Sequence, residues 1–515
     1  MTTTTEDRSR EGQRVRNRGL LTFAVALGAV MQVLDTSMIS VALPHLMGSL
    51  SATQDQVSWV LTFYVIAVAI TTPASGFLSL RIGQKRFFLI CVIGFTTTSV
   101  FCGLSESLVE IVALRTLQGV FAAPLGPMSQ AILLNNYATE ERGTAMGWWT
   151  IGMMFGPIFG PTIGGVITEY FSWSWVFYVN VPIAVATVTL VLVFVPESKD
   201  GTRRPFDMFG FLLLAIALAS MQFMLDQGER QDWFSSRQIM ILAGVSLGAF
   251  YAFVVHSLTA RNPFINPSIF KSRNFTLGLV LMFLLGVIML AVLALMPPYL
   301  QNLSGYPVLT IGLVLAPRGM GTLIASYVAG RMLKHIEPRP IIALGMALCA
   351  FSTWEFSQFT PDVGVAQVII VSTIQGIGMG LFFVPLSIVT FSALSPTQMP
   401  NGTALFALSR NIGSSVGVSI VVGALIRNTQ RNYADIAPGV SPFNDVFRHV
   451  PLPPFWDIDT ATGLAAIGHE VTRQATASAY ISDFLLLTAA SIVCIPLVYL
   501  CRNPRASRVV EANKT

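Results

Sequence analysis

Long apolar runs recur along the whole chain, and no other feature of the sequence limits its folding as strongly. Each run holds about 20 residues, the length that a helix needs to cross a bilayer. The runs are continuous, whereas the strands of a membrane β-barrel alternate between apolar and polar residues. Charged residues make up only 11% of the chain, against roughly 25% in soluble domains. We therefore expect an all-α, polytopic membrane protein.

The runs predict fourteen spans, an even number that places both termini on one side of the membrane. Of the 31 lysines and arginines, 22 fall on the side of the termini, 6 on the other side and 3 inside spans. Positive charge marks the cytoplasmic side, so we expect cytoplasmic termini and a multi-pass protein of the cell (inner) membrane. The expected spans are 20–44, 57–80, 87–105, 107–131, 143–168, 173–195, 206–228, 237–258, 275–297, 309–332, 339–358, 364–392, 402–426 and 479–501.

Several function classes are disfavoured by what the sequence contains. The net charge of +5 follows from the bias in the loops, so it indicates contact with anionic lipid rather than with nucleic acid. The five cysteines have no metal-type spacing. No P-loop, HExxH motif or nucleophile elbow is present. We therefore expect no metal, no cofactor and no catalytic residue, and not an enzyme.

Three weak internal matches point to a duplicated architecture. Gln118-Gly119 matches Gln375-Gly376 at an offset of 257, and two further segment pairs, beginning at Gly143 and Gly76, match at 259 and 254. These offsets indicate a parallel repeat of six helices, with two helices inserted between the halves. The predicted parts are a cytoplasmic tail (1–19), an N-terminal half (20–195), an inserted hairpin with its flanking loops (196–274), a C-terminal half (275–501) and a second cytoplasmic tail (502–515).

One external segment, 427–478, is rich in proline and aromatic residues. Its later part, 461–484, has a helical pattern. A connection this long is often functional. Two interpretations stay open, a docking site for a partner and an inert cap.

Asp35 lies near the middle of the first span. A carboxylate at that depth costs roughly 2.5–3.5 kcal/mol on insertion scales, and such residues tend to face the protein interior and to serve proton or ion pathways. Arg115 in the fourth span has a similar expected depth, so an Asp–Arg pair is plausible, although contact between the two spans does not follow from the sequence. The alternatives are a pair that loads and releases a proton and a static ion pair.

Other charges within spans are weaker candidates. Arg318 and Arg410 are costly enough in the membrane to need partners. Arg410 is expected either to bind a carboxylate or to cap a helix junction. Structural roles are favoured for the charges near helix ends, which are Glu110, Asp226, His256 and Glu355.

Five segments resemble motifs of one transporter family. LDTSMISVALP (34–44) resembles the span-1 signature of 14-helix drug:proton antiporters, and LRTLQGVFAAP (114–124) resembles the span-4 arginine motif of major facilitators. GFLSLRIGQKRFFL (76–89) resembles the major facilitator loop between spans 2 and 3. GMMFGPIFGPTIGG (152–165) is similar to the span-5 antiporter motif, and WSWVFYVNVPIAV (173–185) to the span-6 pattern of the same group. With the fourteen-span plan, the chain resembles the EmrB/QacA drug:H⁺ antiporter branch of the major facilitator superfamily, and most of all its EmrB-type members.

The resemblance implies a proton-coupled antiporter that exports amphiphilic or drug-like compounds, and hence multidrug efflux and antibiotic resistance. Asp35 and Arg115 would couple proton movement to export, with the proton gradient as the energy source. In a Gram-negative host the resemblance also implies a periplasmic membrane-fusion protein and an outer-membrane channel as partners. The alternatives are an exporter of a specific metabolite, siderophore or fatty acid, a sensor or permease without proton coupling, and an integral-membrane enzyme.

Two motifs have structural roles in this interpretation. The span-5 segment is expected to form a bent, tightly packed helix that shifts between conformations. The loop motif departs from the family at Leu80, where the family has an acidic residue, so we expect a tight cytoplasmic turn there, with a gate as the alternative. The span-5 residues are Gly152, Gly156, Pro157, Gly160, Pro161, Gly164 and Gly165, and the loop residues are Gly76, Arg81, Gly83, Lys85 and Arg86.

Soft and adaptable side chains suit a pocket for varied apolar compounds. Each such residue alone is more typical of a core or lipid-facing position, so the pocket is a hypothesis about the set. The candidates are Met31, Gln32, Met38, Trp59, Tyr64, Gln118, Trp148, Met153, Phe155 and Arg410.

Overall fold

The computed structural model of the chain describes residues 17–138, 141–197, 205–441, 456 and 460–502. Among these residues, 14 helices are long and apolar enough to cross a membrane. The predicted all-α fold with fourteen spans is confirmed. Most of the two predicted tails, 1–16 and 503–515, lies outside the described residues.

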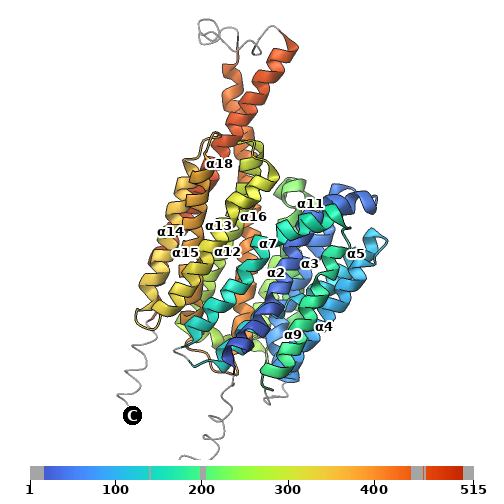
Figure 1. Cartoon of the computed structure of the whole chain (residues 1–515), viewed down its shortest axis with the longest axis vertical. Helices are drawn as coiled ribbons and strands as arrows, with labels where there is room; N and C mark the ends of the chain where they lie inside the picture. Colours follow the sequence, from blue (N-terminus) through green and yellow to red (C-terminus); the bar gives the residue numbers. More distant parts are fainter. Residues whose placement is uncertain (1–16, 139–140, 198–204, 442–455, 457–459, 503–515) are drawn as a thin grey trace, which may run out of the picture.

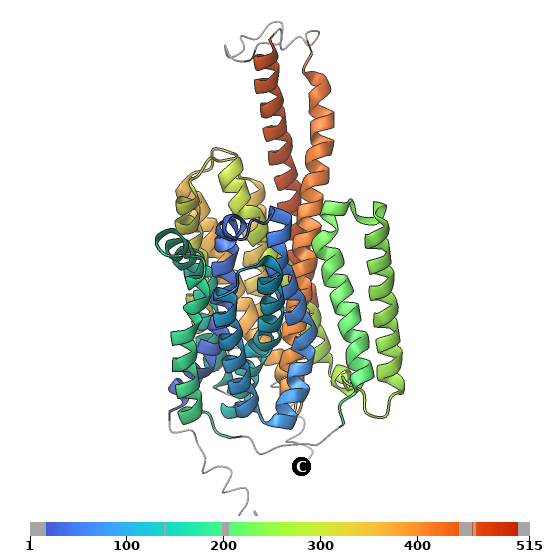
Figure 2. The ribbon, with the colours of Figure 1, turned by 90° about the vertical axis from the view of Figure 1, so that its right-hand side faces the viewer.

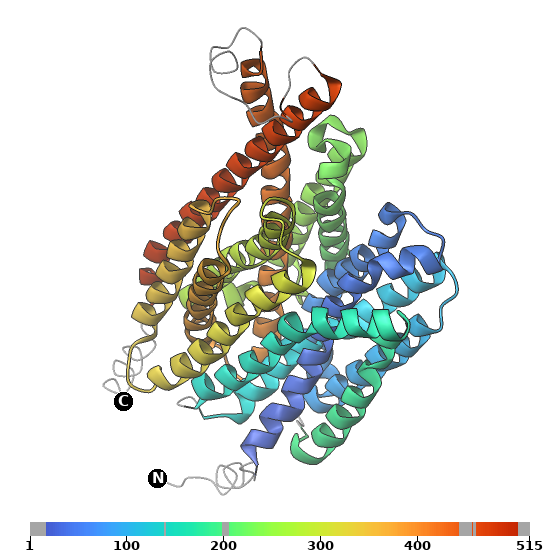
Figure 3. The same cartoon turned by 45° about the horizontal axis from the view of Figure 1, so that its top comes forward.

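The helices group into the two sets of six and the inserted pair (Figures 1 and 3). Short 3₁₀ turns, Glu229–Gln231, Trp233–Ser235, Pro267–Lys271 and Ala437–Gly439, follow or precede spans. The first set is α2 (Arg18–Ser49), α3 (Gln54–Ile82), α4 (Gln84–Gly103), α5 (Leu108–Ala122) with α6 (Leu125–Asn136), α7 (Arg142–Tyr170), and α8 (Trp175–Tyr178) with α9 (Asn180–Phe194). The inserted pair is α10 (Met208–Gln227) and α11 (Arg237–Thr259). The last set is α12 (Arg273–Asn302), α13 (Val308–Met332), α14 (Pro338–Ser357), α15 (Val365–Phe391), α16 (Met399–Ile436) and α18 (Ala461–Tyr499).

Proline explains why the fourth span consists of two helices. Pro124 follows the end of α5 and directly precedes α6. Proline has no backbone N–H to donate and its ring clashes with the preceding turn. The sixth span is also divided, because Val179 separates α8 from α9. This division makes Asn180 the first residue of α9.

Equivalent helices make equivalent contacts in the two halves. In the first half α2 packs against α7 and α3 against α5, and in the second half α12 packs against α16 and α13 against α15. The repeated glycines lie at two of these contacts. A Cβ atom at Gly119 would lie 2.6 Å from the carbonyl oxygen of Tyr64 on α3, and one at Gly376 would collide with the carbonyl oxygen of Arg318 on α13. The offsets in the sequence therefore match a repeat in the packing.

Two helices continue beyond the bundle and form a projection (Figures 1 and 2). The segment 427–478 was predicted as an external loop with a helical later part, but most of it is helical. α16 continues to Ile436 and α18 already begins at Ala461. The amide of Asn432 donates a hydrogen bond of 3.1 Å to the carbonyl of Ala475 and so joins the two. The apolar pattern marks only the part of a helix that lies in lipid, so it does not reveal a polar continuation into water.

The inserted pair stands beside the bundle (Figure 2). α10 packs against α3 and α16, and α11 packs against α10. At one end Thr62 of α3 donates a hydrogen bond of 2.8 Å to Asp226. At the other end Asp207 caps α10 and accepts hydrogen bonds of 2.9 Å from the backbone N–H groups of Gly210 and Phe264. The near-buried carboxyl group of Asp207 also pairs with His256 of α11, at 2.9 Å.

Asp207 therefore ties α10, α11 and the following loop together. Burial opposes its charge, but the hydrogen bonds from Gly210, His256 and Phe264 outweigh burial and hold the pKa of Asp207 below its usual value. Because the pKa is lower in the folded chain, this stabilisation is complete above the ordinary Asp pKa of about 3.9. It is lost as the pH falls through the folded-state value.

We expect Asp207→Ala to lower the free energy of unfolding by about 1–2 kcal/mol, because it removes a helix N-cap. Asp207→Asn is the matched variant. It keeps an oxygen that caps α10 but loses the charge that pairs with His256, so its cost should be smaller. Thermal unfolding of the purified protein in detergent measures both. Equal stability of the wild type and Asp207→Ala would contradict this assignment.

Candidate functional site

The two charges singled out from the sequence meet in the first half. Nη1 of Arg115, on α5, lies 2.7 Å from Oδ2 of Asp35, on α2. Both side chains are fully buried, with exposed fractions of 0%. The pair of Asp35 and Arg115 that the sequence made plausible is therefore a direct ion pair inside the bundle.

Two amides complete the site around the other carboxylate oxygen. Nε2 of Gln118 donates to Oδ1 of Asp35 at 3.2 Å, and Nδ2 of Asn180 donates to the same oxygen at 2.8 Å. Asn180 also donates to Ser99 on α4, at 3.0 Å. Sequence reasoning did not single out Asn180. Asn180 could have been noticed as a polar residue within the apolar span-6 motif. Nothing in the sequence showed that it faces Asp35.

Arg115 is held as tightly as its partner. Its guanidinium lies 4.1 Å from the ring centre of Tyr64 and 5.8 Å from that of Phe177. Nη1 also donates to Oε1 of Gln118, at 2.6 Å, whereas Nε and Nη2 have no hydrogen-bond partner among the described residues. Removing one member of a buried ion pair typically costs 3–5 kcal/mol, because it leaves an uncompensated charge. Neutralising Asp35 therefore favours a rearrangement around Arg115.

The span-5 motif packs α7 against the face of α2 next to Asp35. A Cβ atom at Gly156 would lie 2.7 Å from Cγ1 of Val33 and 2.9 Å from the backbone nitrogen of Leu34. One at Gly164 would lie 2.9 Å from Cα of Met38. Pro157 and Pro161 lie inside the same helix. The glycines allow an approach of helix backbones that any larger residue would prevent.

We expect Gly156→Ala to push α7 away from α2 and to lower both thermal stability and transport. The added methyl group meets backbone atoms that cannot move aside. Gly165→Ala is the matched control, because a Cβ atom there has only Val41 Cγ1 nearby, at 3.9 Å. Thermal unfolding and transport assays on both variants provide the measurement. Equal behaviour of the two variants would show that the approach at Gly156 is not limiting.

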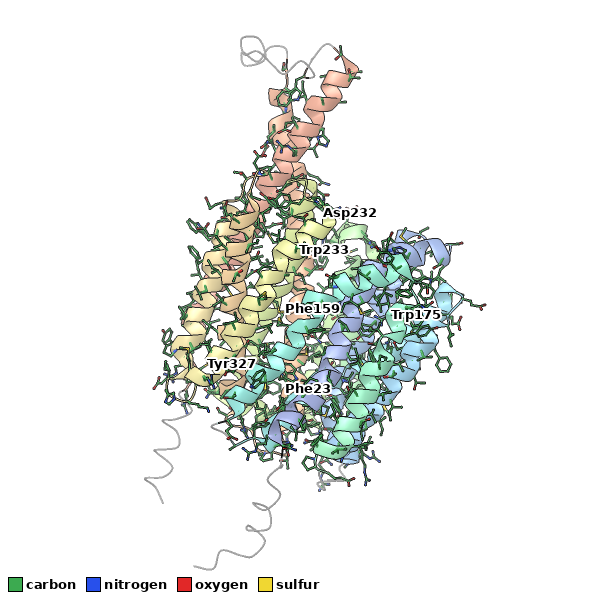
Figure 4. All side chains as sticks on the ribbon, viewed as in Figure 1. Phe23, Phe159, Trp175, Asp232, Trp233 and Tyr327 are labelled. Atoms are coloured by element: carbon green, nitrogen blue, oxygen red, sulfur yellow. The ribbon has the colours of Figure 1, made fainter. Side chains whose placement is uncertain are left out.

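The two halves meet where α2 begins and α18 ends, which we call the terminal face. There the backbones of Gly143 on α7 and Gly330 on α13 are in close contact. Trp148 lies edge-on to Tyr327, with ring centres 5.6 Å apart. Figure 4 shows Tyr327 toward the lower end of the bundle. Farther along α7, Phe159 is 45% exposed. Contacts between α7 and α13 thus join the two halves at the terminal face.

The loop motif joins helices at the same face. Gly83 has a φ of 98°, a conformation that favours glycine, and it separates α3 from α4. Lys85 donates to the carbonyl of Leu192 at 2.8 Å, and Arg86 pairs with Glu197 at 2.6 Å. Gly76 packs directly against Asn401 of the other half, whereas Arg81 is exposed. The motif is therefore a tight turn, as predicted, and its first glycine also lies at the junction between the halves.

The pocket candidates do not form one group in this conformation. Tyr64 and Gln118 belong to the buried network around Asp35. Gln32 and Arg410 are partly exposed. Met31, Met38 and Met153 are buried in the core, and Trp59, Trp148 and Phe155 are exposed.

A second buried carboxylate was missed from the sequence. Asp483 on α18 is 1% exposed, and its Oδ2 has no hydrogen-bond partner among the described residues. The predicted span 479–501 contains Asp483, but the sequence analysis did not single this residue out. No group of three or more His, Cys, Asp or Glu side chains in the described part of the chain is arranged to hold a metal ion.

Comparison with known proteins assigns the family. The sequence matches the Major Facilitator Superfamily over residues 25–418. The chain belongs to the major facilitator superfamily. It is therefore a multi-pass membrane protein and a secondary transporter, not an enzyme.

Individual relatives show where the chain belongs within the superfamily. The chain is 34% identical over 460 residues to the multidrug export protein EmrB of Haemophilus influenzae, covering 88% of this chain and 90% of that protein. It is 31% identical over 489 residues to the fatty acid resistance protein FarB of Neisseria gonorrhoeae, covering 94% and 96%. The human organic anion transporter MFSD10 shares the fold, with a TM-score of 0.59 at 13% identity, over 92% of this chain and 99% of that one. The predicted relationship to EmrB-type transporters is confirmed.

Proposed function

We propose that this protein is a proton-coupled antiporter that exports amphiphilic, drug-like small molecules across the cytoplasmic membrane. The observation that supports it best is the buried pair of Asp35 and Arg115. The relatives named as multidrug export proteins support the substrate class. In this proposal the protein contributes to multidrug efflux and antibiotic resistance.

The coupling step follows from the contacts of Asp35. A proton that binds Asp35 removes its charge and breaks the ion pair with Arg115, so the guanidinium is left among the rings of Tyr64 and Phe177. That state is costly, and α2 can relieve it by moving. Because α2 packs through Gly156 and Gly164 on α7, such a movement reaches the helix that closes the terminal face. Proton binding and opening are thereby linked.

The direction of transport rests on the resemblance to exporters, and the charge bias indicates only which face is cytoplasmic. With the terminal face on the cytoplasmic side, the closed junction of α7 and α13 separates the centre of the molecule from the cytoplasm. The proton then enters from outside and leaves inward, in exchange for substrate. The projection of α16 and α18 extends on the outer side, where a periplasmic membrane-fusion protein and an outer-membrane channel would meet it in a Gram-negative host.

A second candidate is export of one defined class of compound, such as a fatty acid. It is favoured by the relationship to a protein named for fatty acid resistance, which the chain matches over almost its whole length. Export of a panel of lipophilic cations, anions and neutral compounds from a pump-deficient strain, with and without a protonophore, separates the two. Broad, protonophore-sensitive export supports the first candidate, and export of a single class supports the second.

We expect Asp35→Asn to abolish export driven by a pH gradient in proteoliposomes, because the amide cannot carry the proton. Substrate binding and protein abundance should persist. Glu110→Gln is the matched control, since Glu110 is an exposed carboxylate on α5, the helix that also carries Arg115. Undiminished gradient-driven export by Asp35→Asn would remove this carboxylate from the mechanism.

A further inference from the structure

The second half carries an arginine where the first half carries an aromatic ring. Gly119 packs on the backbone of Tyr64, and its repeat counterpart Gly376 packs on the backbone of Arg318. Tyr64 and Arg318 are 254 residues apart, which is the offset of one of the three internal matches. Arg318 on α13 therefore occupies the position that Tyr64 has on α3.

No acidic side chain in the described part of the chain pairs with Arg318. Its Nη2 donates to the carbonyl of Met289 on α12 at 3.2 Å and lies 3.5 Å from Sδ of Met379 on α15. A guanidinium has five N–H donors, so most of its capacity is unused. The side chain is only partly buried, which leaves it accessible. A charge at membrane depth without a partner usually marks a functional site.

The surroundings of Arg318 resemble the Asp35 site without its acid. Met289 lies 254 residues after Asp35, so Arg318 reaches the stretch of α12 that corresponds to the acid position on α2. Gln375 and Ser372 occupy the repeat positions of Gln118 and Arg115. Both are buried, at 0% and 1% exposure. Both side-chain polar atoms of Gln375 and the hydroxyl of Ser372 lack hydrogen-bond partners among the described residues.

A second arginine lies against the same part of α12. The backbone of Arg410 on α16 packs on Gly286, which precedes Met289 by three residues, or about 4.5 Å along the helix. The side chain of Arg410 donates a long hydrogen bond, 3.5 Å, to Oδ1 of the neighbouring Asn411. Arg318 through its side chain and Arg410 through its backbone thus contact the same turn of α12, and neither has a carboxylate partner among the described residues.

We propose that this half binds the carboxylate of an anionic amphiphile, with Arg318 as its principal partner and Arg410 as a second positive charge. An arginine binds a carboxylate through two parallel hydrogen bonds, and the ligand supplies the acid that Asp35 supplies in the other half. Met379, whose sulfur atom lies beside the guanidinium, offers a polarisable, adaptable contact to the apolar tail. The proposal names the substrate class of the transporter and rests on the proposed export function.

Equilibrium binding to the purified protein tests it with dodecanoate and dodecyltrimethylammonium, which share one tail and differ in the charge of the head group. The pH is set well above the ordinary pKa of a carboxyl group. We expect Arg318→Gln to weaken dodecanoate binding by at least about tenfold and to change binding of the cation by less than about twofold. Arg318→Lys keeps the charge but loses the two parallel N–H donors of the guanidinium. Its effect on dodecanoate binding should therefore be intermediate.

Two further variants complete the experiment. Arg410→Gln should weaken dodecanoate binding less than Arg318→Gln does, and it should not weaken binding of the cation. Arg237→Gln, an exposed arginine at the start of α11, is the control and should change neither affinity. Unchanged dodecanoate binding by Arg318→Gln, or an equal loss for both ligands, would overturn the proposal. If Arg318→Gln does not fold, the same comparison on Arg318→Lys and Arg410→Gln decides.

The binding measurement needs no proton gradient, so it is independent of proton coupling. Loss of carboxylate selectivity in the arginine variants supports the site even if Asp35→Asn still exports. If the arginine variants retain carboxylate selectivity, the proposed site is wrong even if Asp35→Asn is inactive in transport.

Discussion

The ion pair between Asp35 and Arg115 is the interaction on which the rest of the first half depends. Two charges in a lipid-embedded bundle are tolerated only together and only with further donors around them. That requirement brings α2 and α5 into contact and adds Asn180 from α9. The ring of Tyr64 on α3 covers the guanidinium. The site therefore fixes four helices relative to one another, and a change in its charge acts on all of them.

The glycine contacts give that site a mechanical connection. α7 lies against α2 without intervening side chains at Gly156 and Gly164, so the two helices have little room to move independently. The same α7 helix meets α13 at the terminal face, through Gly143 and the pair of Trp148 and Tyr327. The acid and the junction between the halves thus belong to one continuous packed unit.

The two halves share a backbone arrangement but differ in chemistry. Gln118 donates to an acid of its own half, whereas its counterpart Gln375 is buried without a partner among the described residues. Arg115 has Asp35, whereas the partners of Arg318 in the described part of the chain are a carbonyl and a sulfur atom. The close approaches at Gly119 and Gly376 occur in both halves, because the helices pack without side chains between them there. The polar groups at the matching positions differ.

The sequence by itself determined the number of spans, the place of the inserted pair and the presence of a charged residue, Asp35, inside the first span. These are local properties, because the thickness of the bilayer sets the length of an apolar run and the cost of a charge within it. The helical pattern of 461–484 predicted where α18 begins, but the continuation of α16 to Ile436 was not predicted, since a polar helical extension leaves no apolar signal. Only the tertiary structure decided that Asn180 faces Asp35, that Gly76 contacts Asn401 and that no acid among the described residues pairs with Arg318. Such contacts join residues far apart in the chain, and they depend on how the helices pack rather than on any one helix.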